Sequence, residues 1–191
     1  TADGNDSVLI NNISQMTNVL GGNGEDTVTV DRLDSLDADK NLRLRIDRDS
    51  LYIDGEADTD RYFIQTSDID EDGLTQTDYL ITVHDSGAPD NGSDTLTIDG
   101  QDDENNSDIF LIRSNFIARL HGDAEAGEFD DRFERINYDS SINGRVSVNG
   151  YAGDDYFFLD DNSAIMTLDG GDDVDTFQIG QILGDDPTPT Q

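Results

Sequence analysis

One short frame recurs along the 191-residue chain and constrains its fold more than any other feature. In each copy an Asp is followed by alternating residues, with an apolar residue two positions later in all eight copies and four positions later in seven. The eight aspartates are Asp6, Asp26, Asp60, Asp94, Asp108, Asp131, Asp155 and Asp175. A period of two is typical of strands that bury one face. The frame therefore predicts an all-β chain whose strands follow turns that end in Asp.

The spacing of the copies predicts how these strands are arranged. Successive aspartates lie 20, 34, 34, 14, 23, 24 and 20 residues apart. Irregular repeats of 20–50 residues are typical of solenoids with insertions. Each 20-residue step has room for two strands and two turns. We therefore predict a right-handed parallel β-helix or β-roll solenoid with a β-hairpin insertion.

The predicted organisation has four parts. Residues 1–30 and 91–184 are expected to form solenoid coils, and residues 31–90 a β insertion with candidate strands at 42–46, 51–53 and 79–83. Residues 185–191 are rich in Asp, Pro and Thr, which indicates a linker. The best helical candidate, residues 31–40, is at most a short turn. Because the chain opens in the middle of a repeat, we expect a segment of a longer protein.

Charge and composition exclude several classes of partner. Acidic residues outnumber Lys and Arg by 44 to 11, so the formal net charge is −33. A chain this acidic is repelled by nucleic acids and by anionic membrane surfaces. No apolar run approaches the roughly 18 residues of a membrane span. The chain has no Cys, which excludes disulfides, thiolate metal sites and a thiol nucleophile. We expect no nucleic-acid partner and no membrane insertion.

The kind of acid is informative too. Of the 44 acidic residues, 37 are Asp and 7 are Glu. Asp is a poor residue for helix interiors but suits turns, and its short carboxylate suits cages of oxygen ligands. Halophilic adaptation is the alternative explanation, but it would scatter acids over the surface, whereas these gather in turns.

A nonapeptide pattern carries a resemblance to a known family. Residues 20–28, Leu-Gly-Gly-Asn-Gly-Glu-Asp-Thr-Val, contain G-G-x-G-x-D-x-U-x, and turns at 3–6, 91–94, 153–155 and 170–175 match it in part. This resembles the RTX, or haemolysin-type, calcium-binding repeat, which implies calcium held between stacked turns of a β-roll. Typical members place two such turns in about 18 residues. Here one turn recurs in each coil of about 20 residues or more, so a second calcium row does not follow from the resemblance.

The chemistry of these turns also favours calcium. Glycine permits positive φ, so backbone carbonyls can face a cation, and calcium takes 6–8 oxygen ligands. An ordinary Asx or Gly turn explains one isolated copy, but several copies, each followed by a strand, favour metal binding. Because cations would offset repulsion between coils, we expect folding to be coupled to the binding of several Ca²⁺ ions. The predicted ligands in the turns are Asp3, Asn5, Asp6, Gly22, Asn23, Gly24, Asp26, Asp60, Asp94, Asp108, Asp131, Asp154, Asp155, Asp173 and Asp175.

A second candidate calcium loop lies in the predicted insertion. Asp68, Asp70 and Asp72 form a D-x-D-x-D-G opening similar to that of an EF-hand loop. The twelfth position is Tyr79 rather than the bidentate Glu, and no flanking helices are expected. A weak calcium loop and a solvated acidic turn both remain open here.

No catalytic or cofactor-binding residue is predicted, and we expect the protein not to be an enzyme. His84 and His121 are the only histidines, and nothing in the sequence brings them together. The chain contains no G-x-S-x-G, P-loop or H-E-x-x-H motif. Carboxylates are too numerous for one pair to stand out as a glycosidase dyad.

Residues 84–90 and 160–165 look similar to tandem segments of very long bacterial surface proteins. This similarity implies an exported, adhesin-like module. We therefore expect a calcium-binding structural module of a secreted or cell-surface bacterial protein, with neighbouring modules of the same chain as partners. One alternative is a calcium-dependent module that binds a glycan or a cell-surface partner through the 31–90 insertion. The other is an RTX-type tail for secretion or folding of an attached enzyme.

Overall fold

The computed structural model describes residues 2–11, 13, 16–31, 33, 50–66, 79–88 and 91–180. These residues form fifteen β-strands and contain no α-helix. In this part of the chain there is accordingly no helix with the length and hydropathy to cross a membrane. The predicted strand at 42–46, the acidic loop at 68–73 and the predicted linker at 185–191 lie outside the described residues.

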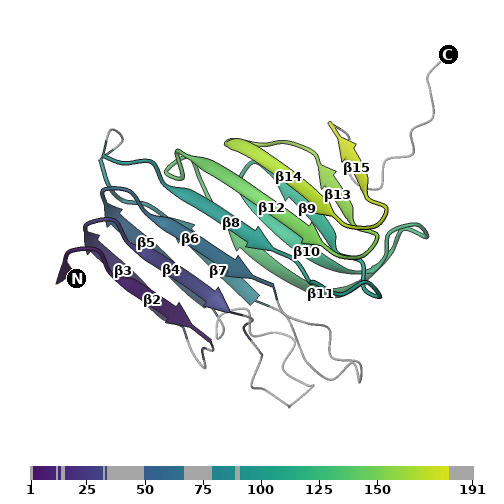
Figure 1. Cartoon of the computed structure of the whole chain (residues 1–191), viewed down its shortest axis with the longest axis horizontal. Coiled ribbons are helices and arrows are strands. Elements are labelled where there is room, and N and C mark those ends of the chain that lie inside the picture. Colours follow the sequence, from purple (N-terminus) through teal and green to yellow (C-terminus); the bar gives the residue numbers. More distant parts are fainter. Residues whose placement is uncertain are drawn as a thin grey trace.

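Six strands form an all-parallel sheet, which Figure 1 shows from its outer side. The strand order is β14–β12–β8–β6–β4–β2. The strands are β2 (Ser7–Ile10), β4 (Thr27–Asp31), β6 (Arg61–Gln65), β8 (Thr95–Asp99), β12 (Arg145–Tyr151) and β14 (Ile165–Gly171).

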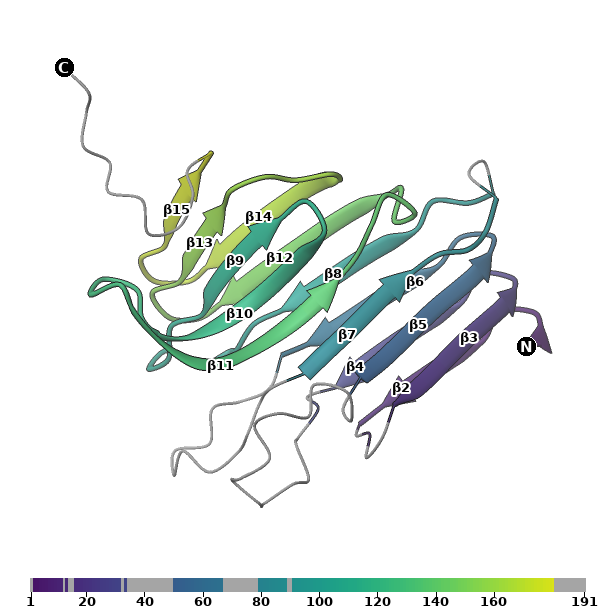
Figure 2. The same cartoon turned by 180° about the vertical axis from the view of Figure 1, so that it is seen from behind.

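Nine strands form the second sheet, seen from behind in Figure 2. Their order is β1–β3–β5–β7–β11–β10–β9–β13–β15. The strands are β1 (Ala2–Asp3), β3 (Thr17–Asn23), β5 (Ser50–Ala57), β7 (Tyr79–His84), β9 (Ile109–Arg113), β10 (Phe116–Asp123), β11 (Glu128–Asn137), β13 (Tyr156–Leu159) and β15 (Thr176–Ile179). Strand β10 pairs antiparallel with β9 and β11, and all other neighbours are parallel.

The recurring frame locates strands correctly. In seven of the eight copies a strand begins on the residue directly after the Asp, as β2 does after Asp6 and β15 does after Asp175. In the eighth copy Asp131 lies inside β11. The all-β prediction is therefore confirmed.

The predicted right-handed β-helix or β-roll solenoid with a hairpin insertion is wrong. The strands form two facing sheets, as in a sandwich, and no closed solenoid, because β9, β10 and β11 turn back on one another within one sheet. The supposed insertion supplies β5 and β7 to one sheet and β6 to the other, all with parallel neighbours. Alternation in a sequence shows that a strand buries one face, but it does not show which strand it pairs with.

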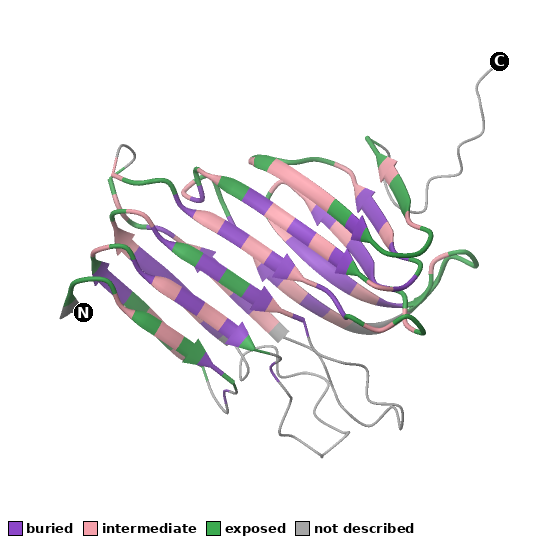
Figure 3. Ribbon diagram, viewed as in Figure 1, coloured by how far each residue is buried: buried purple, intermediate pink, exposed green. Residues whose placement is uncertain are grey.

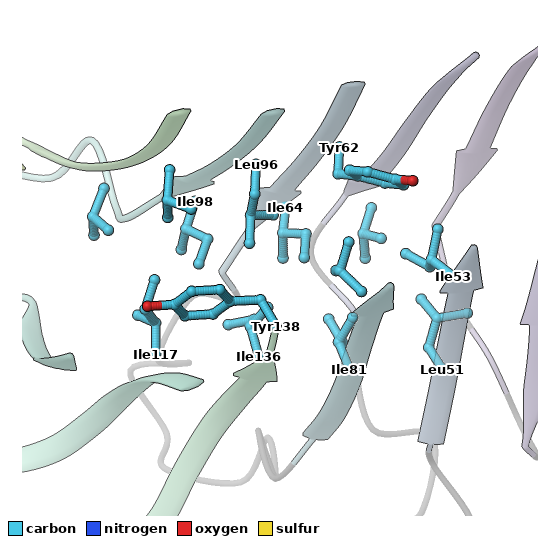
Figure 4. Close-up of a cluster of buried hydrophobic side chains, with 14 of the residues drawn as sticks. Leu51, Ile53, Tyr62, Ile64, Ile81, Leu96, Ile98, Ile117, Ile136 and Tyr138 are labelled. Carbon is cyan, nitrogen blue, oxygen red and sulfur yellow. The ribbon is translucent and has the colours of Figure 1, made fainter. Parts of the chain in front are cut away.

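The core lies between the sheets, where inward side chains from both meet (Figure 4). Parallel register places equivalent residues side by side, so that Val28, Tyr62, Leu96 and Val146 form one inward row. Outward positions alternate with this row and are more exposed (Figure 3). The core therefore extends along the molecule as continuous rows of β-branched, Leu and aromatic side chains, which suit a half-buried pleated surface.

Candidate metal centre

Four turns between the sheets share one design, and we call them the corners. Each runs from a Gly to an Asp five residues later: 21–26, 55–60, 150–155 and 170–175. The second and fourth residues of every corner have φ between 73° and 124°. These residues are Gly22, Gly24, Glu56, Asp58, Tyr151, Gly153, Gly171 and Asp173. Left-handed conformations are uncommon for residues other than Gly, so the surrounding structure imposes the shape of the corner.

The Asp that ends a corner holds neighbouring strands in register. Its Oδ1 accepts a hydrogen bond from the backbone N–H of the equivalent residue one strand away. The pairs are Asp6 N to Asp26 (2.7 Å), Asp26 N to Asp60 (2.7 Å), Asp108 N to Asp155 (2.7 Å) and Asp155 N to Asp175 (3.1 Å). Outside the four corners, Asp94 Oδ1 accepts from the Asp60 N–H (2.9 Å) in the same way, and Asn143 Oδ1 accepts from the Asp94 N–H (2.9 Å). The amide oxygen of Asn143 accepts an equivalent hydrogen bond, so this contact between strands requires one oxygen acceptor and no charge.

The second carboxylate oxygen of each corner Asp lies over the corner's own Gly. A Cβ added to Gly55 would lie 2.1 Å from Asp60 Oδ2, and the other three corners are as tight. The Oδ2 atoms of Asp26, Asp60 and Asp155 are buried and accept no hydrogen bond. A buried carboxylate oxygen without a partner is energetically unfavourable and points to a missing group.

Three of the buried aspartates come together between β6, β7 and β8. Asp54 of β5 pairs with His84 of β7 in register. The next residue after β7, Asp85, therefore lies level with Gly55 on β5. This places the Asp85 carboxylate beside Asp60 and Asp94, with one oxygen of each within 4.8 Å of the others. The three residues are between 1% and 5% exposed. Because Asp60 and Asp94 precede strands of one sheet and Asp85 follows a strand of the other, the cluster joins the two sheets.

Tyr62 adds a fourth oxygen to this cluster. Its hydroxyl donates to Asp85 Oδ2 at 3.2 Å and accepts from the Gly55 N–H at 2.9 Å. Tyr62 Oη and Asp60 Oδ2 both lie within 2.4 Å of the point that a Cβ on Gly55 would occupy. Carboxylate and hydroxyl oxygens are ligands for hard cations such as calcium, and the set contains no nitrogen or sulfur.

The electrostatics of the cluster favour a bound cation. Burial raises the pKa of Asp60 to about 7; the N–H of Asp26 opposes this, and the charges of Asp85 and Asp26 add to it. Burial also raises the pKa of Asp94, despite the hydrogen bond from the Asp60 N–H. Within the described residues no salt bridge reaches any of the three carboxylates.

The other half of the molecule shows how such a cluster is neutralised. There the guanidinium of Arg119, on β10, binds the buried carboxylate of Asp108 and lies 3.7 Å from Glu134. Arg119 and Asp108 are each 1% exposed. Arg119 thus neutralises the buried charge of Asp108. No described basic residue neutralises Asp60, Asp85 and Asp94 in the same way.

Asp60 and Asp94 are therefore the predicted ligands that the fold brings together, and Asp85 is the ligand that sequence reasoning missed. Aligning the ends of the strands would have revealed it: Val19-Leu20-Gly21, Ile53-Asp54-Gly55 and Val83-His84-Asp85 follow one pattern. Among the residues that the structure describes, these three aspartates form the group of metal-ligand side chains whose oxygen atoms lie close enough together to share one ion.

The other predicted ligands have different surroundings. Asp3, Asn5 and Asp154 are exposed and accept hydrogen bonds from Asn23 Nδ2, Glu25 N and Val174 N of the neighbouring corner. Asp26, Asp108, Asp155 and Asp175 belong to the register contacts above, as does Asp6 through its N–H. Gly22, Gly24 and Asp173 supply positive φ. The side chain of Asp131 and the residues Asp68, Asp70 and Asp72 lie outside what the structure describes.

A Ser, a His and an Asp also lie in contact at the C-terminal end of β7, where His84 is the last residue of the strand. His84 Nδ1 lies 2.9 Å from Asp139 Oδ2 and 3.3 Å from Ser141 Oγ. In a catalytic triad the Asp and the Ser contact different ring nitrogens, so that the His can pass a proton between them. Here one nitrogen makes both contacts, and Ser141 Oγ also accepts from the Asp85 N–H at 2.9 Å. The group therefore anchors the loop that holds Asp85.

Comparisons with known proteins add no relative. No family, no curated protein and no solved structure matches the chain.

Proposed function

We propose that this chain is a calcium-stabilised structural module of a large extracellular protein. In this proposal Asp60, Asp85 and Asp94 bind a divalent cation that fastens the two sheets to each other. The observation that carries the proposal is the burial of three carboxylates within 4.8 Å, with no basic partner among the described residues.

Two further features support calcium as the ion and a structural role. The oxygen-only ligand set suits calcium, and the net charge of −33 gives bound cations a large stabilising effect. The resemblance of residues 20–28 to the RTX repeat supports an exported, bacterial setting. The proposal concerns one buried cation site. Binding of further calcium ions at the exposed corners remains a prediction from the sequence.

The test is a calorimetric calcium titration of the chelator-treated chain, with circular dichroism on the same samples. We expect binding by the wild type and at least ten-fold weaker binding by Asp60→Asn and by Asp85→Asn. The matched control is Asp155→Asn, because Asp155 is equally buried and makes the same register contact but lies in the other half of the molecule, away from the cluster. Its affinity should match that of the wild type.

The same variants separate metal binding from folding. In chelator, Asp60→Asn should raise the melting temperature, because the amide keeps the Oδ1 contact and removes a buried charge, as Asn143 shows. In calcium it should lower the melting temperature relative to the wild type. The proposal fails if the folded wild type binds no calcium, or if Asp155→Asn weakens binding as much as Asp60→Asn.

A further inference from the structure

The outer side of the six-stranded sheet carries an unusual surface, which we call the hydroxyl strip. The six strands lie side by side (Figure 1), and their register aligns two rows of outward side chains across all of them. One row is Ser7, Thr27, Arg61, Thr95, Arg145 and Ile165. The other row is Leu9, Thr29, Phe63, Thr97, Ser147 and Thr167.

The composition of the strip departs from that of the chain. Seven of its twelve side chains are Ser or Thr and none is acidic, although 44 of the 191 residues are Asp or Glu. The next outward row again carries acids, at Asp31, Asp99 and Asp169. All twelve side chains of the strip are exposed or half-buried. Acids are thus excluded from one accessible band of a strongly acidic molecule.

The shape and chemistry of the strip define what it can bind. Neighbouring strands lie about 4.7–4.9 Å apart, so the hydroxyls form regular ranks that run across the strands. Phe63, 37% exposed, lies among these hydroxyls, and Leu9 and Ile165 lie at the two ends. A surface that mixes hydroxyls with apolar groups matches sugar rings, which have apolar C–H faces and hydroxyl edges.

Charge selects among sugar polymers. The net charge of −33 repels polyanions, and Arg61 is already near Glu25, with 3.7 Å between their charged atoms. A polycation would be attracted to carboxylates outside the strip, and Arg61 and Arg145 would repel it from the strip itself. Of the strip's two cations, Arg61 lies near Glu25 and Arg145 donates to Thr167 Oγ1 at 2.7 Å, so the strip suits an uncharged ligand.

We propose that the hydroxyl strip binds an uncharged linear polysaccharide, laid across the six strands. Hydroxyls of Thr27, Thr95 and Thr97 exchange hydrogen bonds with sugar hydroxyls, and Phe63 packs against a ring face. The 31–90 segment that the sequence suggested for glycan binding supplies two of the twelve side chains, Arg61 and Phe63, and the other ten lie outside it. The use of the strip does not depend on the cation site.

The experiment is co-sedimentation of the full chain with cellulose and with chitin, and titration with soluble oligosaccharides of each. We expect retention of the wild type, and at least ten-fold weaker binding by Thr95→Glu, Thr97→Glu and Phe63→Ala. The matched control is Thr82→Glu, on an outward position of β7 in the opposite sheet. Circular dichroism confirms that each variant is folded, and Asp60→Asn should bind the polysaccharide like the wild type.

Four results would overturn the proposal. The folded wild type could bind neither polymer. It could bind only acidic polysaccharides such as alginate. The strip variants could bind as tightly as Thr82→Glu. The wild type could inhibit ice recrystallisation through the same threonines and leave both polymers unbound, which would assign the strip to a crystalline water surface instead.

Discussion

At the scale of single residues, the corners store backbone strain in a repeated position. Glu56, Asp58, Tyr151 and Asp173 have φ between 73° and 81°, where a side chain costs about 1–2 kcal/mol. Glycine holds the same positions in the 21–26 corner, at Gly22 and Gly24. The four corners thus have one conformation, with glycine in some and strained residues in others.

We predict that Glu56→Gly preserves or raises the free energy of unfolding, because relief of strain outweighs the added flexibility of the unfolded chain. Gly24→Ala should lower it by more than about 1 kcal/mol. The new Cβ would also lie 2.6 Å from the Gly4 carbonyl oxygen. Urea denaturation measures both effects. Glu56→Ala is the control, since it removes the side chain but keeps the strain, and a gain equal to that of Glu56→Gly would contradict the explanation.

At the scale of secondary structure, the β9–β10–β11 segment is the one place among the described strands where neighbours pair antiparallel. Its middle strand brings Arg119 into the interior, against Asp108 and Glu134. Removing one partner of a buried ion pair leaves an uncompensated charge, which costs about 3–5 kcal/mol.

We therefore expect Arg119→Met to lower the free energy of unfolding by about 3–5 kcal/mol. The control lies in the same segment: Arg113→Met removes a partly exposed ion pair with Asp160, worth about 0–1 kcal/mol. Adding Asp108→Asn to Arg119→Met should recover part of the loss, because the buried charge is then gone. Equal losses for the two Arg variants would show that buried charge is not the cause. Chemical denaturation with a two-state fit provides the measurement.

The segments show what sequence reasoning could and could not reach. Strand starts were predictable, because in seven of the eight copies the residue after the Asp begins a strand of alternating residues. Pairing was not predictable, because Leu51, Ile53, Tyr62 and Ile64 alternate alike but belong to different sheets. Asp60 and Asp94 were found because they recur in the frame. Asp85 was missed because it follows a strand instead of preceding one, and only the register of β5 with β7 brings it to Asp60.

At the scale of the whole molecule, protons and cations compete for the same buried carboxylates. Burial raises the pKa of both Asp60 and Asp155 to about 7, from an ordinary 3.8. The neighbouring Asp108 and Asp175 add to the shift of Asp155, and the Asp108 N–H and Arg119 oppose it. Between pH 4 and 7 the folded chain therefore holds protons that the unfolded chain has released, and stability falls as pH rises.

We predict that the metal-free chain melts at a higher temperature at pH 5 than at pH 7.5. Thermal unfolding in chelator across this range checks the sign. The double variant Asp60→Asn/Asp155→Asn should flatten the dependence, which separates these two groups from the general charge of the surface. In calcium the trend should reverse for the wild type, because protons displace the ion as pH falls. A wild type that gains stability steadily up to pH 7.5 in chelator would contradict the assignment.

The strand order has a mechanical consequence. The described chain begins in β1 at one end of the sheets and finishes in β15 at the other, and every strand lies across the line that joins them (Figure 1). Tension applied at these two ends therefore pulls neighbouring strands apart, and it acts on the hydrogen bonds of one strand pair at a time. Strands would then peel away from the edges singly, at low force, and the module would lengthen in steps. A cation that ties β6, β7 and β8 together would act as a stop in the middle of that extension, so calcium would set the length at which the segment stiffens.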